Sequence, residues 1–187
     1  MFDRDRFTQD CLDAIRETDS HMAVKELVER ACSDPADLLR GLGEPTKAGP
    51  DKLYVSDELT ILNLVWGPYM TLLPHNHNMW AVIGLYTGAE DNVFWKKVDG
   101  EPGHTRIEAA GAKAMRPGDV APLGKDIVHS VTNPLDRLTG ALHVYGGNFF
   151  EEPRSEWEAQ GLTERPYDVP RNMALFETYN EKLQAAE

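Results

Sequence analysis

The chain has 187 residues, of which 41% are hydrophobic and 27% charged, and its net charge is −12. This length is enough for one domain with a sizeable core, and the composition is typical of a globular protein. The acidic balance argues against binding to nucleic acid or to an anionic membrane through a basic surface.

The two cysteines, Cys11 and Cys32, are too few for a disulfide framework or a cysteine-rich zinc site. We expect them to be half-buried structural thiols. The sequence has no apolar run long enough to span a membrane, and its first residues lack the apolar core of a signal peptide. The expected compartment is therefore the cytoplasm.

Residues 1–50 are predicted to form a helical segment that packs on the rest of the domain. The stretches FTQDCLDAIRE and AVKELVERAC each place apolar side chains at helical spacing. Asp34 and Pro35 suit the cap and the first residue of a short third helix, which is predicted to end at Gly41.

Residues 51–150 are predicted to form an all-β barrel. Short apolar runs rich in Val, Ile, Leu, Trp and Tyr recur about eight to twelve residues apart and are separated by Gly, Pro, Asn and Asp. Residues 151–187 are more polar and are predicted to be an extension in which NMALFETYNEKLQ forms a closing helix outside the barrel. The whole chain is expected to be a single domain.

The run LLPHNHNMWAVIGLYTG places His75 and His77 one residue apart on a predicted strand. Alternate residues of a strand point to the same face, so these two imidazoles can share one metal ion while Asn76 points away. The pair alone also fits two unrelated histidines of the surface or the core.

A second run, GDVAPLGKDIVHSVTN, places His129 after a glycine and a proline-glycine turn. Together with PHNH and Gly88, it resembles the paired motifs of the cupin superfamily, a double-stranded β-helix or jelly-roll barrel. The resemblance covers about residues 60–147. It implies that His75, His77 and His129 converge on one metal ion.

Many cupins add a glutamate shortly after the histidine pair, where this chain has Ala81 and Val82. The implied site therefore has three neutral histidine ligands. Fe(II) bound by neutral ligands keeps its full charge and attracts anions such as thiolates. Zinc also accepts three imidazoles, and Zn, Ni and Mn are alternatives to Fe(II).

The segment GALHVYGGNFFEEPR places His143 and Tyr145 on one strand face, where the imidazole can hydrogen-bond the phenol. A core tyrosine with a satisfied hydroxyl is the alternative from these residues alone. LHVY resembles the Ser-His-Tyr stretch of cysteine dioxygenase-like thiol dioxygenases, which are three-histidine iron cupins. The resemblance implies catalytic roles for Tyr145, near substrate and oxygen, and for His143, which orients it. Ala141 stands at the serine position, so the relay is shortened.

Two departures argue against cysteine as the substrate. The cysteine that crosslinks to the tyrosine in animal-type enzymes would fall near Val82, where this chain has no cysteine. The arginine that holds the substrate carboxylate would lie near Tyr54–Ser56, where this chain has no arginine. Arg154 instead matches the arginine of bacterial mercaptopropionate-type relatives, and a guanidinium suits a carboxylate. A solvated loop arginine beside Glu151 and Glu152 is the alternative. The chain is more similar to bacterial proteins described only as predicted metal-dependent cupins.

The remaining candidates have simpler interpretations. Trp80 is close enough in sequence to His77 to line the same pocket, and we assign it to substrate binding with Arg154. The other tryptophans suit the core or barrel wall. His21 and His104 are expected to be solvated, and the acidic pairs 90–91 and 151–152 are expected to be solvated turns.

These observations predict an iron-dependent oxygenase that uses O2 to oxidise a small thiol, bearing a carboxylate, to its sulfinate. Two alternatives remain: a three-histidine metal enzyme acting on a non-thiol molecule, and a metal- or ligand-binding protein without turnover. The expected partners are the small-molecule thiol and O2, with no nucleic acid and no membrane. The protein is expected to be a monomer or a homodimer.

Overall fold

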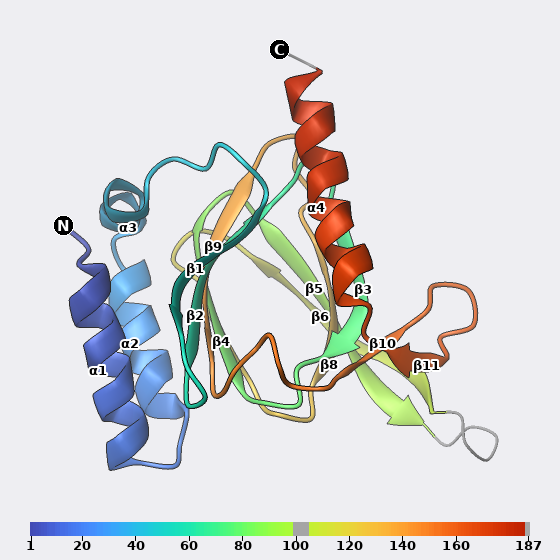
Figure 1. The fold of residues 1–187 in the computed structure, drawn as a ribbon, viewed down its shortest axis with the longest axis horizontal. Coiled ribbons are helices and arrows are strands. Elements are labelled where there is room, and N and C mark those ends of the chain that lie inside the picture. The colour runs from blue at the N-terminus through green and yellow to red at the C-terminus, as the bar shows by residue number, and fades with distance from the viewer. Residues whose placement is uncertain (99–104, 186–187) are drawn as a thin grey trace.

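Two antiparallel β-sheets face each other in the computed structural model, which describes residues 1–98 and 105–185 (Figure 1). The strands are β1 (Gly49–Val55), β2 (Thr60–Trp66), β3 (Thr71–Asn76), β4 (Ala81–Thr87), β5 (Glu90–Val98), β6 (Arg106–Met115), β7 (Val120–Leu123), β8 (Val128–Thr132), β9 (Thr139–Tyr145), β10 (Ser155–Trp157) and β11 (Glu164–Pro166). The first sheet has the order β1-β2-β9-β4-β7, and the second sheet has the order β11-β10-β3-β8-β5-β6.

The chain passes back and forth between these sheets. It runs through β2 in the first sheet, crosses to β3 in the second, returns with β4, crosses again with β5 and β6, and then repeats the crossing with β7, β8 and β9. This path through paired antiparallel strands is the double-stranded β-helix, or jelly roll, of cupins. The predicted fold class is confirmed.

Side chains on the strands of the first sheet alternate between the inside of the barrel and its outer face. Leu62 and Ile83 point inward and belong to the interior cluster that also contains Tyr145. Their neighbours Ile61 and Val82 point outward and pack against helices. The central strands of the first sheet, β2, β9 and β4, are therefore buried on both faces.

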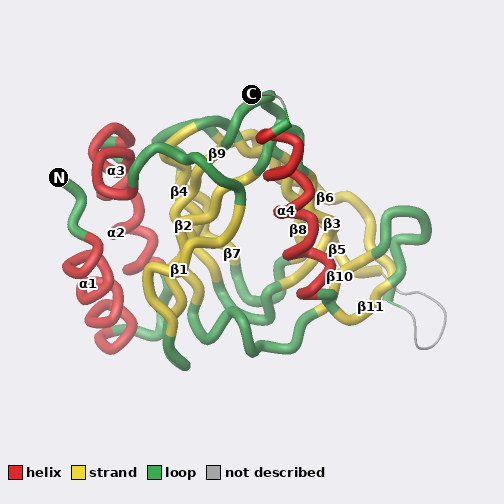
Figure 2. The backbone as a smooth tube through the Cα atoms, turned by 45° about the horizontal axis from the view of Figure 1, so that its top comes forward, coloured by secondary structure: helices red, strands yellow, loops and turns green. Residues whose placement is uncertain are grey.

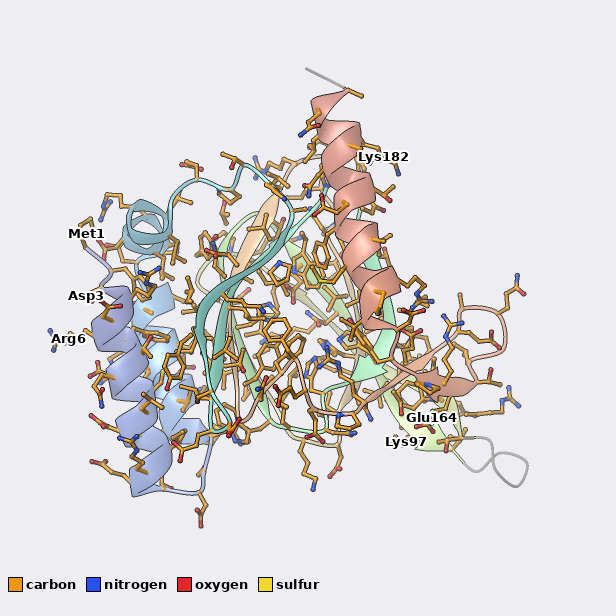
Figure 3. The ribbon with its side chains drawn as sticks, viewed as in Figure 1. Met1, Asp3, Arg6, Lys97, Glu164 and Lys182 are labelled. Atoms are coloured by element: carbon orange, nitrogen blue, oxygen red, sulfur yellow. The ribbon has the colours of Figure 1, made fainter. Side chains whose placement is uncertain are left out.

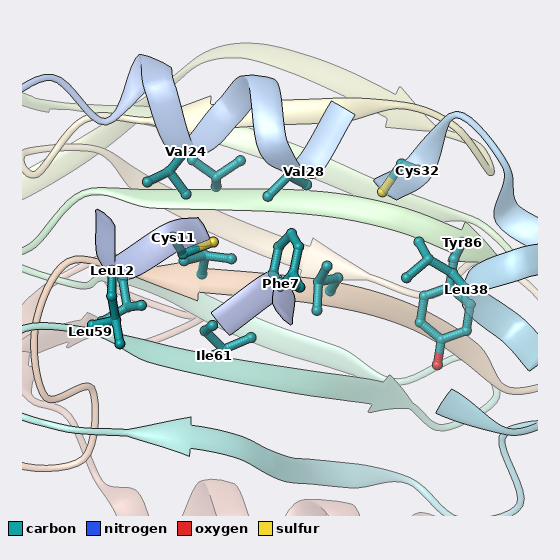
Figure 4. Packing of buried hydrophobic residues seen from close by; sticks show 13 residues of the cluster. Phe7, Cys11, Leu12, Val24, Val28, Cys32, Leu38, Leu59, Ile61 and Tyr86 are labelled. Atoms are coloured by element: carbon teal, nitrogen blue, oxygen red, sulfur yellow. The ribbon is translucent and has the colours of Figure 1, made fainter. Parts of the chain in front are cut away.

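Three N-terminal helices cover the outer face of the first sheet (Figures 1 and 2). They are α1 (Arg4–Glu17), α2 (Met22–Cys32) and α3 (Pro35–Leu42). Phe7 and Leu12 from α1 pack with Val24 and Val28 from α2 and with Ile61 of the sheet (Figure 4). The predicted helical stripes are therefore the faces that cover the barrel.

The third helix begins as predicted but ends later. The carboxylate of Asp34 accepts a hydrogen bond from the backbone N–H of Asp37, which is the expected cap. The predicted end at Gly41 was wrong. Gly41 lies inside the helix, where Phe2 leaves no room for a side chain, and Gly43 takes the left-handed φ of 90° that ends it.

Both cysteines are buried more deeply than predicted. Cys11 and Cys32 are fully buried between the helices and the first sheet. Burial raises the pKa of each thiol to about 12, and the neighbouring Asp10 adds to the effect at Cys11. Both groups are therefore protonated packing residues.

The C-terminal extension contributes strands as well as a helix. β10 pairs with β3, and β11 pairs with β10, so both enlarge the second sheet. The helix α4 (Val169–Gln184) lies on the side of the barrel away from α1–α3 (Figure 2). Its Phe176 stacks on Trp66 with 5.8 Å between ring centroids, so α4 packs against the barrel.

Charged side chains such as Arg6, Lys97 and Lys182 project outward around this framework (Figure 3). His104 lies outside the described residues. Within the described part of the chain, no helix has both the length and the apolar character needed to cross a membrane.

The contact between α2 and β4 gives a test of the packing. A Cβ atom on Gly84 would lie well inside van der Waals contact with Val28 and Cys32, whereas one on Gly111 would meet nothing within 4 Å. We expect Gly84→Ala to lower the free energy of unfolding by about 1–3 kcal/mol, because an extra methyl group in a packed core forces side chains out of their preferred rotamers and shifts the backbone. Gly111→Ala, also in a strand, should change it little. Denaturant unfolding measures both, and equal stability of the two variants would contradict this packing.

Candidate metal centre

Three histidines converge inside the barrel. β3 and β8 are neighbours in the second sheet, and their register places the Cα atoms of His75 and His129 opposite each other. His77 follows just after the end of β3. The Nε2 atom of His77 lies 3.2 Å from that of His75 and 3.3 Å from that of His129, and all three side chains are buried.

This spacing fits a bound metal ion. A metal with bonds of about 2.0–2.1 Å to imidazole nitrogens, at angles between octahedral and tetrahedral values, holds those nitrogens about 3 Å apart. The observed separations lie in that range, and the three donor atoms are all within 4.8 Å of one another. The three histidines could therefore hold one metal ion.

A bulge in β3 orients the first of them. The register with β8 shifts between Leu72 and His75, so β3 contains one more residue than its partner at Leu73–Pro74. Proline cannot donate to a strand ladder and is tolerated at such bulges. The Leu73 carbonyl accepts a hydrogen bond from His75 Nδ1, at 2.8 Å. The Nδ1 proton leaves the Nε2 lone pair for the metal.

A side chain performs the same task at His129. Its Nδ1 lies 2.8 Å from Asn92 Oδ1, and Asn92 Nδ2 donates to Glu90 Oε1 at 2.8 Å. The other carboxylate oxygen of Glu90 accepts from Trp66 Nε1 at 2.9 Å. The prediction of a solvated turn was wrong for Glu90, which is 0% exposed. Its place on β5, two residues before Asn92, points it into the barrel.

Burial keeps the histidines neutral and able to bind a metal. It lowers the pKa of His75 to about 4, against the Leu73 hydrogen bond that favours the proton, and nearby Arg154 adds to the lowering. Burial also lowers the pKa values of His77 and His129 well below 6.5, and the neighbouring histidines lower them further. The site therefore offers three neutral donors without a carboxylate.

The His143–Tyr145 pair lies in the same cavity. β9 places both side chains on its inner face, and His143 Nδ1 is 2.9 Å from the Tyr145 hydroxyl oxygen. The Tyr145 ring packs edge-on to His77, with 5.2 Å between centroids. Burial raises the pKa of Tyr145, so the phenol is protonated. His143 Nε2 is buried without a partner among the described residues, and Ala141 offers no hydroxyl.

Arg154 also lines this cavity and is only 9% exposed. Its guanidinium lies between the rings of Phe149 and Tyr167, with 3.9 and 4.4 Å to the centroids. Nη1 donates to the Phe149 carbonyl oxygen, whereas Nε is buried without a partner among the described residues. The predicted alternative, a solvated loop arginine, does not describe this side chain.

The residues around the first two histidines hold Arg154 in place. Asn76 Oδ1 accepts from the backbone N–H of Ser155 at 2.8 Å, and Asn78 donates to the Pro153 carbonyl at 2.8 Å. Asn76 also donates to Asn78. The motif PHNHN therefore supplies two metal-ligand candidates and two anchors for the segment that carries Arg154. No pattern in the sequence indicates this role for the two asparagines.

The cavity is otherwise mostly apolar and is covered by the C-terminal extension. Tyr167 and residues of α4 complete its wall. The apolar lining residues are Pro50, Leu62, Leu64, Trp66, Leu72, Val131, Phe149, Phe150, Val169, Met173 and Phe176. A ligand at the histidines would therefore be largely shielded from water.

The structure places Trp80 away from this cavity. Its ring stacks on His21 at 5.7 Å between centroids and lines a separate surface depression with Gly146. Strand alternation explains the difference, because Trp80 has the parity of Val82, which faces the helices, and Ala81 has the inward parity. The predicted pocket-lining role of Trp80 is not supported by this position. His21 is partly buried rather than fully solvated.

No family model matches the chain. Similar solved structures include an RmlC-like cupin family protein with a double-stranded β-helix fold from Methanocaldococcus jannaschii, at 11% identity over 58% of this chain and 87% of that chain, with a TM-score of 0.43. A cupin superfamily protein from Desulfitobacterium hafniense is 13% identical over 59% of this chain and 88% of that chain, with a TM-score of 0.44. The DMSP lyase DddQ from Ruegeria pomeroyi is 18% identical over 53% of this chain and 43% of that chain, with a TM-score of 0.40.

Removal of one ligand candidate tests the centre. We expect His77→Ala to weaken metal binding by more than about 100-fold, since even the loss of a ligand's hydrogen-bond partner costs about 10–100-fold. His21→Ala is the matched control, because His21 lies outside the cavity. Metal content after anaerobic Fe(II) loading and gel filtration measures both. A His77→Ala protein that holds metal as tightly as the control would refute this centre.

Proposed function

We propose that this protein is a non-haem Fe(II)-dependent oxygenase that uses O2 to oxidise a small thiol, bearing a carboxylate, to its sulfinate. The proposal rests on one juxtaposition. Three neutral histidine donors share a buried cavity with a His–Tyr pair and with an arginine whose Nε has no partner. Each of these groups matches one requirement of the reaction.

The ligand set favours an anionic substrate atom. Three imidazoles leave a divalent ion with its full positive charge, so a thiolate in an open coordination position is stabilised. Bound Fe(II) would supply the open positions for both reactants and the redox chemistry that O2 requires. His75, His77 and His129 would hold it, and holding both reactants in one site replaces a collision with an intramolecular step.

The overall reaction is balanced without a further reductant. A thiol and one O2 give a sulfinate and one proton, with both oxygen atoms transferred to sulfur. Sulfur loses four electrons, and O2 accepts the same four. The proposal therefore requires no second organic substrate, which agrees with one cavity for all the named groups.

Arg154 is suited to the carboxylate. Its guanidinium carbon lies over the rings of Phe149 and Tyr167, and Nη1 donates to a backbone carbonyl, so Nε remains for a ligand. A buried donor without a partner is costly unless a ligand satisfies it. A carboxylate that accepts from this edge would fix the orientation of the substrate, with its sulfur directed to the histidines.

Tyr145 and His143 are suited to manage a proton beside the reacting atoms. When His143 Nδ1 donates to the phenol oxygen, the hydroxyl proton is available to the substrate; when the hydroxyl donates to Nδ1, it is withdrawn. Because burial favours the neutral forms of both groups, a proton can be offered or withdrawn without a charged side chain. The apolar wall limits competing water.

Oxygen uptake with matched thiols tests the proposed reaction. We expect iron-loaded protein to consume O2 with 3-mercaptopropionate, to form the sulfinate, and to act much more weakly on propanethiol, which has the same carbon chain without a carboxylate. An oxygen electrode and mass spectrometry of the product measure both. Iron bound near one per chain without uptake on any thiol would refute the thiol oxygenase and favour a non-thiol substrate or a binding protein.

The same thiol pair tests Arg154. We expect Arg154→Gln to raise KM for 3-mercaptopropionate by about 10–100-fold, since a charged hydrogen bond contributes roughly 1.5–3 kcal/mol. The rate with propanethiol should change little. Arg137→Gln, at an exposed arginine outside the cavity, is the control. If Arg154→Gln retains the full preference for the carboxylate, another residue recognises it.

Replacement of the phenol tests the proton role. We expect Tyr145→Phe to lower kcat by about 100-fold or more, which is the usual range for loss of a positioned proton donor, with iron content unchanged. Tyr86→Phe is the matched control, because Tyr86 is equally buried but its hydroxyl bonds Asn63 on the outer face of the first sheet. Equal turnover in both variants would remove Tyr145 from the mechanism.

A further inference from the structure

We propose that Glu90, acting through Asn92, fixes the tautomer and orientation of His129 and thereby sets the metal affinity of the site. The sequence alone indicates no role in metal binding for Glu90 or Asn92. Both are positioning residues, because they reach the metal site only through His129. The inference rests on the metal-binding part of the proposed function and is independent of the reaction.

The direction of each hydrogen bond follows from the chemistry of the groups. Trp66 Nε1 can only donate, and it donates to Glu90 Oε2. Asn92 presents its NH2 group to Glu90 Oε1, and this bond and the one from Trp66 favour the carboxylate form against the burial that raises the pKa of Glu90. The amide oxygen of Asn92 therefore faces His129. That oxygen accepts from His129, so the proton is on Nδ1. The Nε2 lone pair is thereby directed to the metal.

The burial of these hydrogen-bonded groups restricts the Asn92 amide to one orientation. Glu90, Asn92, Trp66 and His129 are each at most 2% exposed. An inverted amide would place its oxygen against the Glu90 carboxylate, so that two acceptors face each other, and its NH2 group against the Nδ1–H of His129, so that two donors face each other. These groups are buried, so solvent does not compensate for either mismatch. The carboxylate therefore decides the amide orientation, and the amide decides the tautomer.

The tautomer of His129 depends on the orientation of a side chain, whereas that of His75 does not. His75 is oriented by the Leu73 carbonyl, which cannot invert. His129 faces a side-chain amide, which could present either its oxygen or its nitrogen. Without Glu90, an inverted Asn92 would donate to Nδ1 and place a proton on Nε2, where a metal would bind.

A neutral substitution and its compensating partner test the proposal. Glu90→Gln offers one oxygen to two donors, so it can satisfy Trp66 only if its NH2 group faces Asn92, which must then invert. The double variant Glu90→Gln/Asn92→Asp restores the order: Trp66 donates to Gln, Gln donates to Asp, and Asp accepts from His129 Nδ1. Its net charge equals that of the natural protein. Asn63→Leu, which removes a buried asparagine bonded to Tyr86 outside the barrel interior, is the control for packing.

Two readouts that do not depend on turnover are used. Long-range 1H–15N NMR of the metal-free protein reports which nitrogen of His129 carries the proton. Competition with a chelating dye reports the affinity for Zn(II) alone. We expect the Nδ1–H tautomer in the natural protein. In Glu90→Gln we expect the Nε2–H tautomer and about 10–100-fold weaker zinc binding, with both restored in the double variant.

The outcomes separate this proposal from the proposed function. An Nε2–H tautomer in the natural protein would overturn it, even if no variant folds. Natural affinity and tautomer in Glu90→Gln would also overturn it, as would a folded double variant no better than the single one. Equal loss of zinc binding in Asn63→Leu would assign the effect to packing. Failure of thiol oxidation alone would overturn the proposed function and leave these results unaffected.

Discussion

The register of β3 against β8 is the constraint on which the candidate site depends. It places His75 opposite His129 on neighbouring strands, so two donor nitrogens meet without any loop between them. The bulge at Leu73–Pro74 belongs to the same pairing, because it inserts the residue whose carbonyl orients His75. A shift of one residue in this ladder would turn one histidine to the outer face.

Some polar groups of the cavity have a hydrogen-bond partner among the described residues, and others have none. Nδ1 of His75 and of His129 each has a protein partner, and their Nε2 atoms converge. Arg154 Nε and His143 Nε2 are buried without one among the described residues. Buried polar atoms are normally hydrogen-bonded, so the two exceptions, in a cavity where three imidazole nitrogens converge, indicate where a ligand would complete the network.

The sequence was sufficient for the parts of the fold that periodicity determines. The helices 1–50, the strand-rich region and the histidine pair follow from spacing, because spacing fixes which side chains share a face. Glu90 and Trp80 were misjudged for one reason: the parity of a strand depends on where it begins. An acidic pair after a glycine suggests a turn, but β5 starts at Glu90 itself and turns it inward. The alternation of Glu90, Asn92 and Phe94 was the signal that could have revealed this.

Trp80 shows the same dependence across a loop. It is three residues from His77, but Asn78 has a φ of 55°, so the strand phase is not carried through the turn. Side chains on the two sides of such a turn cannot be assigned to one face from sequence. Contacts with distant segments are equally hidden, as for the hydrogen bonds of Asn76 and Asn78 to residues near Arg154.

The C-terminal extension joins the cavity wall to the strand that carries the first histidine. Glu156 is the β10 partner of His75, and its buried carboxylate accepts from Arg165 of β11 and from Arg171 and Asn172 of α4. A buried carboxylate with several charged donors is strongly destabilised when its partners are removed, so these elements are held as one unit. Arg154, two residues before Glu156, is part of that unit. The guanidinium and the histidines are therefore held by the neighbouring strands β10, β3 and β8, and the distance between a substrate's two polar ends is set by the second sheet rather than by a flexible tail.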